Sequence, residues 1–238
     1  MNGLQALLNP QSIAILGASA DFAKVNGRTL RYLLEKGHAG KIFPINPKYQ
    51  AIGALRCYPD IASVPEPVDL AVVAVPARLV PGALRDLGRH GVKSAVVFSS
   101  GFAETGDAGR ALENEAIAAA RESGLRLCGP NCLGLINVPG RVASTFTPIA
   151  GLPMFPGKVG MVSQSGSVGG SIVNRLLDKG VGVNYFFSSG NEADLEASDF
   201  MEFLLDDPAT EIIAAFIESF KDASKFLRVA DRAQKLGK

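Results

Sequence analysis

The sequence has 238 residues, a formal net charge of +1 and 47% hydrophobic residues. A chain this close to neutral lacks the basic excess typical of nucleic-acid and membrane surfaces, so we expect neither of these partners. Its apolar runs are too short to span a bilayer, and its N-terminus shows no basic region followed by an apolar core. These features predict a cytoplasmic protein.

Strands and helices alternate in the first half of the chain. Continuous apolar runs predict buried strands, and helical periodicity predicts the segments between them. The predicted strands are 12–19, 41–47, 68–76, 93–101 and 125–131, and the predicted helices are 26–37, 77–91 and 108–124. Apolar strands separated by helices are typical of a parallel, doubly wound α/β sheet, which binds its ligands at the carboxyl ends of the strands.

The chain changes character after residue 137. Residues 138–157 are rich in Pro and Gly and show no periodicity, which predicts a linker. Three strand–helix units follow over 158–238. We therefore predict a first domain over 1–137 and a second over 158–238. Because three strands make a poor sheet, we expect the second domain to be incomplete or to be completed by another chain.

The stretch LCGPNCLGLIN, residues 127–137, places Cys128 and Cys132 around a Gly-Pro-Asn turn. The chain has three cysteines, an odd and low count that is typical of a reducing compartment. A zinc site needs about four Cys or His ligands, and the two histidines, His38 and His90, are distant in sequence. The C-x-x-x-C spacing also differs from the C-x-x-C of redox pairs. The pattern favours a tight loop without a metal site.

The segment LGASADFAKVNG, residues 16–27, joins the first strand to the first helix. Gly17 and Ser19 lie where a helix N-terminus favours an anion, although the full G-x-G-x-x-G pattern of dinucleotide sites is absent. The second strand ends in Asn46-Pro47-Lys48 and not in the acid that binds the ribose of NAD. A base there favours a nucleotide with an extra ribose phosphate, as in CoA or NADP. The alternative is an ordinary glycine turn.

The segment VSQSGSVGG, residues 162–170, is a second candidate phosphate site. Ser165, Gly166 and Ser167 end a strand and open a helix, where hydroxyl and N–H groups can hold a phosphate. A simple helix N-cap is the alternative. The nucleophile elbow G-x-S-x-G lacks its first glycine here, and no histidine follows, so a Ser-His-Asp hydrolase is disfavoured. Glu218, at the end of a later apolar strand, faces the same cleft region or is simply solvated.

The two histidines are predicted to be structural. His38 lies between a helix end and the second strand, opposite the ligand loops, and is expected to be a solvated turn residue. His90 ends a helix, where a partial positive charge is favourable.

Taken together, the loops identify a family. The ordered set is SIAILGAS, IFPINPK, VDLAVVAVPA, VVFSSGFAE, GPNCLGLIN, GKVGMVSQSGSVG and SSGNEADLEASDF. It resembles the NDP-forming (ADP-forming) acyl-CoA synthetases, which include acetate–CoA ligases, and more distantly the alpha subunit of succinyl-CoA synthetase. The resemblance implies a Rossmann-like CoA-binding domain followed by a partial flavodoxin-like domain. The family makes an acyl-CoA from a carboxylic acid, CoA and ATP, and releases ADP and phosphate through an acyl phosphate and a phosphohistidine.

The resemblance also implies roles for individual residues. Asn131 would lie where thiol, acyl group and phosphate meet, with Cys132 as a small apolar filler. The phosphoryl group would bind at Ser165, Gly166 and Ser167, and Glu218 matches the carboxylate that orients the phosphohistidine. CoA would bind through Gly17, Ala18, Ser19, Lys24, Asn46, Pro47, Lys48, Val75, Pro76, Ala77, Ser100 and Gly101.

The sequence departs from the family at one point. The family's phosphohistidine follows a strand that would come after residue 238, and the ATP-grasp region is also missing from this sequence. The resemblance therefore implies that ATP or ADP with Mg²⁺ binds only through an ATP-grasp domain or a beta-type subunit. We expect a homo- or hetero-oligomer that binds CoA and a small carboxylic acid, with no turnover by this chain alone. The alternative is a non-catalytic CoA- or nucleotide-sensing Rossmann module, or the regulatory part of a fused protein acetyltransferase.

Overall fold

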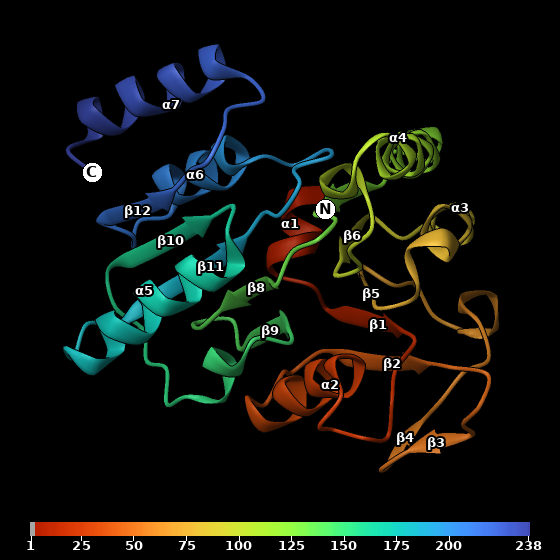
Figure 1. Ribbon diagram of the computed structural model, residues 1–238. Helices are drawn as coiled ribbons and strands as arrows, with labels where there is room; N and C mark the ends of the chain where they lie inside the picture. Colours follow the sequence, from red (N-terminus) through yellow and green to blue (C-terminus); the bar gives the residue numbers. More distant parts are fainter. Residues whose placement is uncertain (1–2) are drawn as a thin grey trace.

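The computed structural model describes residues 3–238, which form two five-stranded sheets and a small two-stranded hairpin (Figure 1). The first sheet is entirely parallel, with the strand order β2-β1-β5-β6-β7. Its strands are β1 (Ser12–Leu16), β2 (Lys41–Ile45), β5 (Leu70–Val73), β6 (Ser94–Val97) and β7 (Arg126–Cys128). The predicted doubly wound α/β class is confirmed.

Both faces of the first sheet are buried because its strands are apolar beyond their first residues. Ile13 and Ile15 of β1 enter one core cluster, and Ala14 and Leu16 enter the other. One face is covered by α3 (Val80–Arg89) and α4 (Asp107–Glu122). The other face packs against α1 (Gly3–Leu8), α2 (Val25–Glu35) and part of the second sheet. Together the two clusters explain the absence of polar alternation in these strands.

The strand order places a switch point beside β1. The connection after β1 leads outward to β2, and the connection after β2 returns to β5 on the other side of β1. Where neighbouring connections leave in opposite directions, a crevice opens beyond the carboxyl ends of the strands. The loops after β1, β2 and β5 therefore border the candidate ligand site. The hairpin of β3 (Ala51–Ile52) and β4 (Leu55–Arg56) follows β2.

The second sheet is mixed, with the order β12-β10-β11-β8-β9. Three strands are parallel, as expected: β10 (Val159–Ser163), β11 (Val183–Ser188) and β12 (Ile212–Phe216). The helices α5 (Gly166–Asp178), α6 (Ala197–Asp206) and α7 (Ala223–Leu236) follow them. Two antiparallel strands, β8 (Gly134–Asn137) and β9 (Val142–Thr145), extend this sheet beyond β11. The expectation of three strands is therefore wrong.

The segment 138–157 was expected to be a plain linker and is not. It contains β9 and a short 3-10 helix (Pro148–Gly151). All four residues of β9 are buried, including Ser144 and Thr145, whose polarity removed the alternation that marks a strand. The Thr145 hydroxyl donates to the Leu133 carbonyl at 2.5 Å. The domain boundaries stay a proposal, since the first part of this segment belongs to the second sheet.

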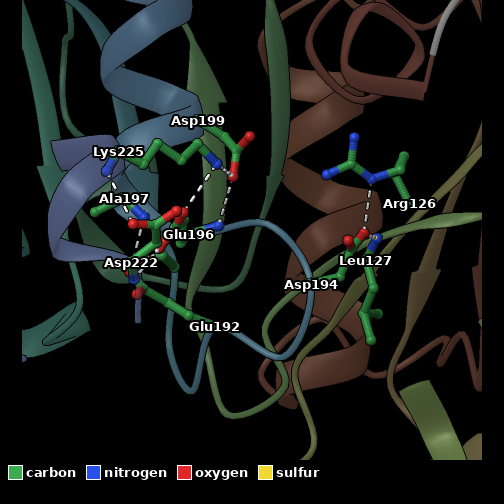
Figure 2. Close-up of polar contacts among 10 residues, drawn as sticks. Arg126, Leu127, Glu192, Asp194, Glu196, Ala197, Asp199, Asp222 and Lys225 are labelled. Carbon is green, nitrogen blue, oxygen red and sulfur yellow. Dashed lines mark hydrogen bonds and ion pairs between the residues drawn. The ribbon is translucent and has the colours of Figure 1, made fainter. Parts of the chain in front are cut away.

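The loop 189–196 ties the two sheets together along the free edge of β7. Its backbone N–H groups at Ala193 and Leu195 donate to the carbonyls of Gly129 and Leu127, each at 3.0 Å. The Asp194 carboxylate accepts the Leu127 N–H and the Arg126 guanidinium, each at 2.8 Å (Figure 2). The loop therefore pairs with an edge that a five-stranded sheet would otherwise leave open.

Among residues 3–238, none of the helices combines the length and the apolar character needed to cross a bilayer.

Candidate functional site

A groove of about 820 Å³ opens at the switch point of the first sheet. It is lined by residues predicted from the sequence as CoA-binding: Gly17, Asn46, Pro47, Lys48, Val75 and Pro76. It is also lined by residues that the sequence analysis did not assign to a site, in the turn 59–62 and at α3, including His90, which was predicted to be structural. These are Pro59, Asp60, Ile61, Ala62, Leu79, Ala83, Asp86, Arg89 and His90. No motif marks them, because they reach the groove only through the packing of α3 beside the turn.

Gly17 ends β1 in a conformation that only glycine adopts easily. Its φ is +83°, and a Cβ atom there would lie 2.7 Å from the Ala74 carbonyl oxygen and 3.3 Å from a Val75 methyl group. Two independent constraints, the positive φ and the close approach of the loop after β5, therefore require a glycine at the floor of the groove.

The backbone N–H groups of Gly17 and Ala18 are not available for a phosphate. Both donate to the Ile45 carbonyl, at 2.9 and 3.2 Å. The sequence predicted a cradle of N–H groups after the first strand, and these two do not belong to it, because they continue the pairing of β1 with β2. Ser19 is buried, and its hydroxyl accepts the Asp21 N–H at 3.1 Å. Lys24 forms an ion pair with Asp21 at 3.7 Å, just before α2.

The Asn46 side chain shapes the groove through two hydrogen bonds. Its amide nitrogen donates to the Ala18 carbonyl at 2.8 Å, and its amide oxygen accepts the Lys48 N–H at 3.0 Å. The first bond joins the ends of β1 and β2, and the second fixes the turn that carries Lys48. Asn46 therefore positions Lys48 at the rim.

Some charged side chains around the groove already have a partner, and one does not. Arg89 is paired with Asp86 at 2.6 Å. Two hydrogen bonds from Ser63 lower the pKa of the Asp60 carboxyl. Lys48 is exposed, and within residues 3–238 its ammonium group has no ion-pair partner. The Lys48 ammonium group can therefore pair with an anionic ligand in the groove.

The remaining predicted CoA residues lie next along the same edge of the sheet. A Cβ atom on Gly101 would lie 3.4 Å from the Ala77 side chain. The loops after β5 and β6 are therefore in contact. The Ser99 hydroxyl donates to the Val75 carbonyl at 2.5 Å. Ser100 is exposed, and the Gly101 N–H donates to the Glu104 carboxylate at 2.6 Å. None of Ala77, Ser100 and Gly101 lines the groove itself.

The turn that contains both cysteines follows in the same direction. The Asn131 N–H donates to the Ser99 carbonyl at 2.9 Å, and Asn131 itself is exposed with φ +54°. Cys128 and Cys132 are 1% and 4% exposed, and no disulfide forms. The Cys128 thiol has a pKa well above its ordinary value because of the neighbouring Cys132 thiol and because of burial. Both cysteines are therefore packing residues here, as expected.

Asn191 connects this turn to the loop after β6. Its amide nitrogen donates to two carboxylates, Glu104 at 2.5 Å and Glu113 at 2.8 Å, and its oxygen accepts from Asn131 at 3.2 Å. Burial opposes ionisation of Glu104, but the hydrogen bonds from Asn191 and Gly101 outweigh it and lower the pKa of that carboxyl. Sequence reasoning missed Asn191, since nothing in the loop 189–196 indicates its partners.

The second candidate site, at the start of α5, touches the same turn. The Ser165 hydroxyl accepts the Val168 N–H at 3.4 Å, so Ser165 is the N-cap, as the alternative interpretation of this motif held. A Cβ on Gly166 would lie 2.3 Å from Leu133, so the turn 129–134 reaches the helix start. Ser167 is exposed, and the first N–H groups of a helix have no partner within it. The arrangement can accept an anion through Gly166 and Ser167.

Glu218 is exposed and lies just beyond β12, whose last residue pairs in register with Ser163 of β10. Its backbone N–H donates to the Gln164 side chain at 2.6 Å. The structure therefore places Glu218 and the start of α5 after neighbouring strand ends, as the sequence predicted.

Glu192 is a buried acid that sequence reasoning did not identify. It is 5% exposed and accepts hydrogen bonds from Ser189, Ala197 and Gln164 at 2.7 to 2.9 Å. Burial raises the pKa of its carboxyl, although those hydrogen bonds oppose the shift.

This raised pKa gives a prediction for stability. A carboxyl group whose pKa is higher in the folded state than in the unfolded state stabilises the fold when it is protonated. This stabilisation is lost as the pH rises from the unfolded-state pKa, about 4.3, through the folded-state pKa. Glu192→Gln removes the titration. Relative to the parent chain, its free energy of unfolding should rise as the pH increases above about 4. Urea unfolding of both proteins tests this, and a difference that stays constant with pH would contradict it.

The two histidines lie away from the start of α5. His38 follows α2, but both of its ring nitrogens are buried without a hydrogen-bond partner, so the expectation of a solvated ring is wrong. Desolvation by burial lowers its pKa. His90 ends α3, as expected, and its ring bonds to the Glu66 carbonyl at 3.1 Å. Within residues 3–238, no three Cys, His, Asp or Glu side chains converge as metal ligands.

Comparisons with known proteins agree with this geometry. The CoA binding domain family matches residues 11–138, and the succinyl-CoA ligase-like flavodoxin domain family matches residues 156–238. The chain is 36% identical to the alpha subunit of acetate–CoA ligase (ADP-forming) I from Pyrococcus furiosus, over 98% of this chain and 50% of that subunit. The chain belongs to the CoA binding domain family. The resemblance seen in the sequence is thereby confirmed.

Further relatives show how much of these longer proteins the chain matches. Acetate–CoA ligase (ADP-forming) I of Archaeoglobus fulgidus is 39% identical over 95% of this chain and 32% of that protein. The solved acetyl-coenzyme A synthetase 1 of Ca. Korarchaeum cryptofilum, in complex with phosphate and ADP, superposes with a TM-score of 0.91 and 39% identity, over 98% of this chain and 50% of that one. The chain thus spans a third to a half of the length of these relatives.

Proposed function

We propose that this chain is the CoA-binding and partial ligase portion of an acid–CoA ligase that forms ADP. The groove at the switch point carries the proposal, because it joins a glycine floor at Gly17 to an uncommitted cation at Lys48. An open α/β sheet binds nucleotides at this position. Family membership supports CoA as the nucleotide, and a volume of about 820 Å³ suits a ligand of that size class.

The order of contacts supports a direction for the bound CoA. The nucleotide would lie in the groove, with its ribose phosphate near Lys48. The pantetheine arm would follow Val75, Pro76 and Ala77, and then Ser100 and Gly101. The thiol would arrive at the turn 129–134, where Asn131 is exposed. A phosphoryl group at Gly166 and Ser167 would then face the thiol across Leu133, with Glu218 beside it.

The phosphoryl donor is proposed to come from outside the residues of this chain. The ring nitrogens of His38 are buried and the His90 ring bonds to the Glu66 carbonyl, so neither histidine is placed to carry a phosphoryl group to Ser167. An ATP-grasp domain or beta-type subunit would supply the phosphoryl group from ATP with Mg²⁺, as the family resemblance implies. The acid is a small carboxylic acid, the site is cytoplasmic, and assembly is with further subunits.

Amide shift mapping tests this function on the chain itself. We expect added CoA to shift the amide signals of Gly17 and Lys48 together with those of the turn 129–134. Inorganic phosphate should shift Gly166 and Ser167 instead. CoA shifts confined to other surfaces, or acyl-CoA synthesis from acetate, CoA and ATP by the purified chain alone, would contradict the proposal. Nucleotide binding in the groove that stops short of the turn 129–134 would favour a sensing module.

Lys48 gives a sharper prediction about ligand choice. An exposed charge-assisted contact contributes about 1 kcal/mol, so Lys48→Ala should weaken CoA binding by roughly five- to tenfold. Binding of dephospho-CoA, which lacks the ribose phosphate, should be nearly unchanged. Lys93→Ala removes an exposed lysine from the opposite end of the sheet and serves as the control. Equal weakening of both ligands by Lys48→Ala would exclude this role.

A further inference from the structure

The side-chain amide of Gln164 is saturated with hydrogen bonds. Its oxygen accepts the backbone N–H groups of Glu218 and Ser219, at 2.6 and 3.0 Å. Its nitrogen donates to the Ser219 carbonyl at 2.7 Å and to the Glu192 carboxylate at 2.9 Å. One side chain, located between β10 and α5, therefore holds the backbone that follows β12.

Glu192, together with the Ser219 carbonyl, holds the nitrogen side of this amide. A glutamine amide can exchange its oxygen and nitrogen by rotation, whereas an ionised carboxylate only accepts hydrogen bonds. Because Glu192 accepts from Gln164, the nitrogen must face Glu192 and the oxygen is left for the two N–H groups.

The environment of Glu192 holds the carboxylate in place. The Ser189 hydroxyl donates to it at 2.7 Å. The Ala197 N–H donates to it at 2.9 Å (Figure 2). Within the described residues 3–238, no Lys or Arg pairs with this carboxylate; nearby Lys225 pairs with Glu196 and Asp199 instead (Figure 2). Burying a carboxylate without a paired cation costs free energy. The site nevertheless keeps Glu192, with hydrogen-bond donors directed at its carboxylate.

We propose that Glu192 and Gln164 form a positioning pair for the loop that carries Glu218. The pair fixes this loop beside the start of α5, because Gln164 directly precedes the N-cap Ser165. The inference deepens the role given to Glu218 and rests on the proposed function for its chemical purpose. Its test uses no CoA, so the two can fail separately.

In Glu192→Gln, the new amide nitrogen faces the Gln164 nitrogen, so two donors meet without an acceptor. Otherwise the Gln164 amide must rotate and exchange the positions of its oxygen and nitrogen. Either outcome weakens the bonds to Glu218 and Ser219. Amide hydrogen exchange of these two residues, followed by NMR, should accelerate about tenfold or more. The double variant Glu192→Gln with Gln164→Glu restores a donor facing an acceptor. The carboxylate at position 164 also loses the bond that Gln164 donates to the Ser219 carbonyl. The double variant should therefore recover only part of the lost protection, through charge-assisted bonds to the two N–H groups.

Glu196→Gln is the matched control, since Glu196 is also a buried acid of the same loop but accepts from Asp222. It should accelerate exchange at Asp222 and leave Glu218 and Ser219 unchanged. If Glu192→Gln does not fold, Gln164→Met removes the same bonds from a half-exposed position and should give the same acceleration. Unchanged exchange at Glu218 and Ser219 in the folded variant, or no recovery in the double variant, would overturn the proposal. Calorimetric titration with CoA in parallel reports on the proposed function alone.

Discussion

Gly17→Val is expected to weaken CoA binding by at least 100-fold and to lower the free energy of unfolding by roughly 3 kcal/mol. The reason is geometric: the backbone at Gly17 has φ +83°, and even a Cβ atom would lie 2.7 Å from the Ala74 carbonyl oxygen. The loop after β5 must move away, and the branched side chain must enter the floor of the groove. Calorimetric titration of the folded variant with CoA measures the loss.

Gly53→Val separates backbone strain from the effect on the groove. Gly53 also has a positive φ, +60°, but a Cβ atom there has no neighbour within 4 Å. It lies in the exposed hairpin turn between β3 and β4. We expect a comparable strain cost but CoA affinity within about twofold of the parent, because the groove stays intact. Retained binding in Gly17→Val, or equal losses in both variants, would contradict the placement of the ligand at Gly17.

Asn191→Asp is expected to lower the free energy of unfolding at neutral pH by about 3 kcal/mol. In the parent chain, Asn191 donates to Glu104 and to the buried Glu113. An aspartate removes both donated bonds and adds a third negative charge between the two carboxylates. The loss should shrink as the pH falls toward about 4, where carboxyl groups become protonated. Urea unfolding at two pH values measures both effects.

Asn114→Asp is the control for this variant. Asn114 is exposed on α4, so the same change of charge there should alter the free energy of unfolding by no more than about 0.5 kcal/mol. A loss below about 1 kcal/mol in Asn191→Asp would mean that the bonds through Asn191 do not hold the two sheets together. The stability of the turn at Asn131 would then need another explanation.

The first sheet could be predicted from the sequence because its signals are local. Each strand is a short apolar run, each helix has its own periodicity, and turn residues such as Gly17 and Pro47 mark the ends. The carboxyl ends of parallel strands meet at one edge, so the order of the loops predicted which of them border the groove. Lys48 and Val75 could be placed in this way without coordinates.

Other parts of the structure depend on contacts that leave no local signal. β9 is buried although Ser144 and Thr145 are polar, because it pairs with β8 and contacts α2 of the first sheet's layer. The face of α3 that lines the groove, including Leu79 and Asp86, reaches it only through the turn 59–62. Asn191 and Glu192 find their partners in segments that are distant in sequence. Such pairings are determined by tertiary structure, and one sequence does not contain them as a pattern.

Calorimetric titration of the 238-residue chain with CoA, and separately with NAD, tests the central claim most directly. The account predicts one CoA site per chain and no measurable heat from NAD, because the second strand ends in Asn46-Pro47-Lys48 and offers no acid to the NAD ribose. Binding of NAD without binding of CoA would contradict it, and the groove would then be a dinucleotide site.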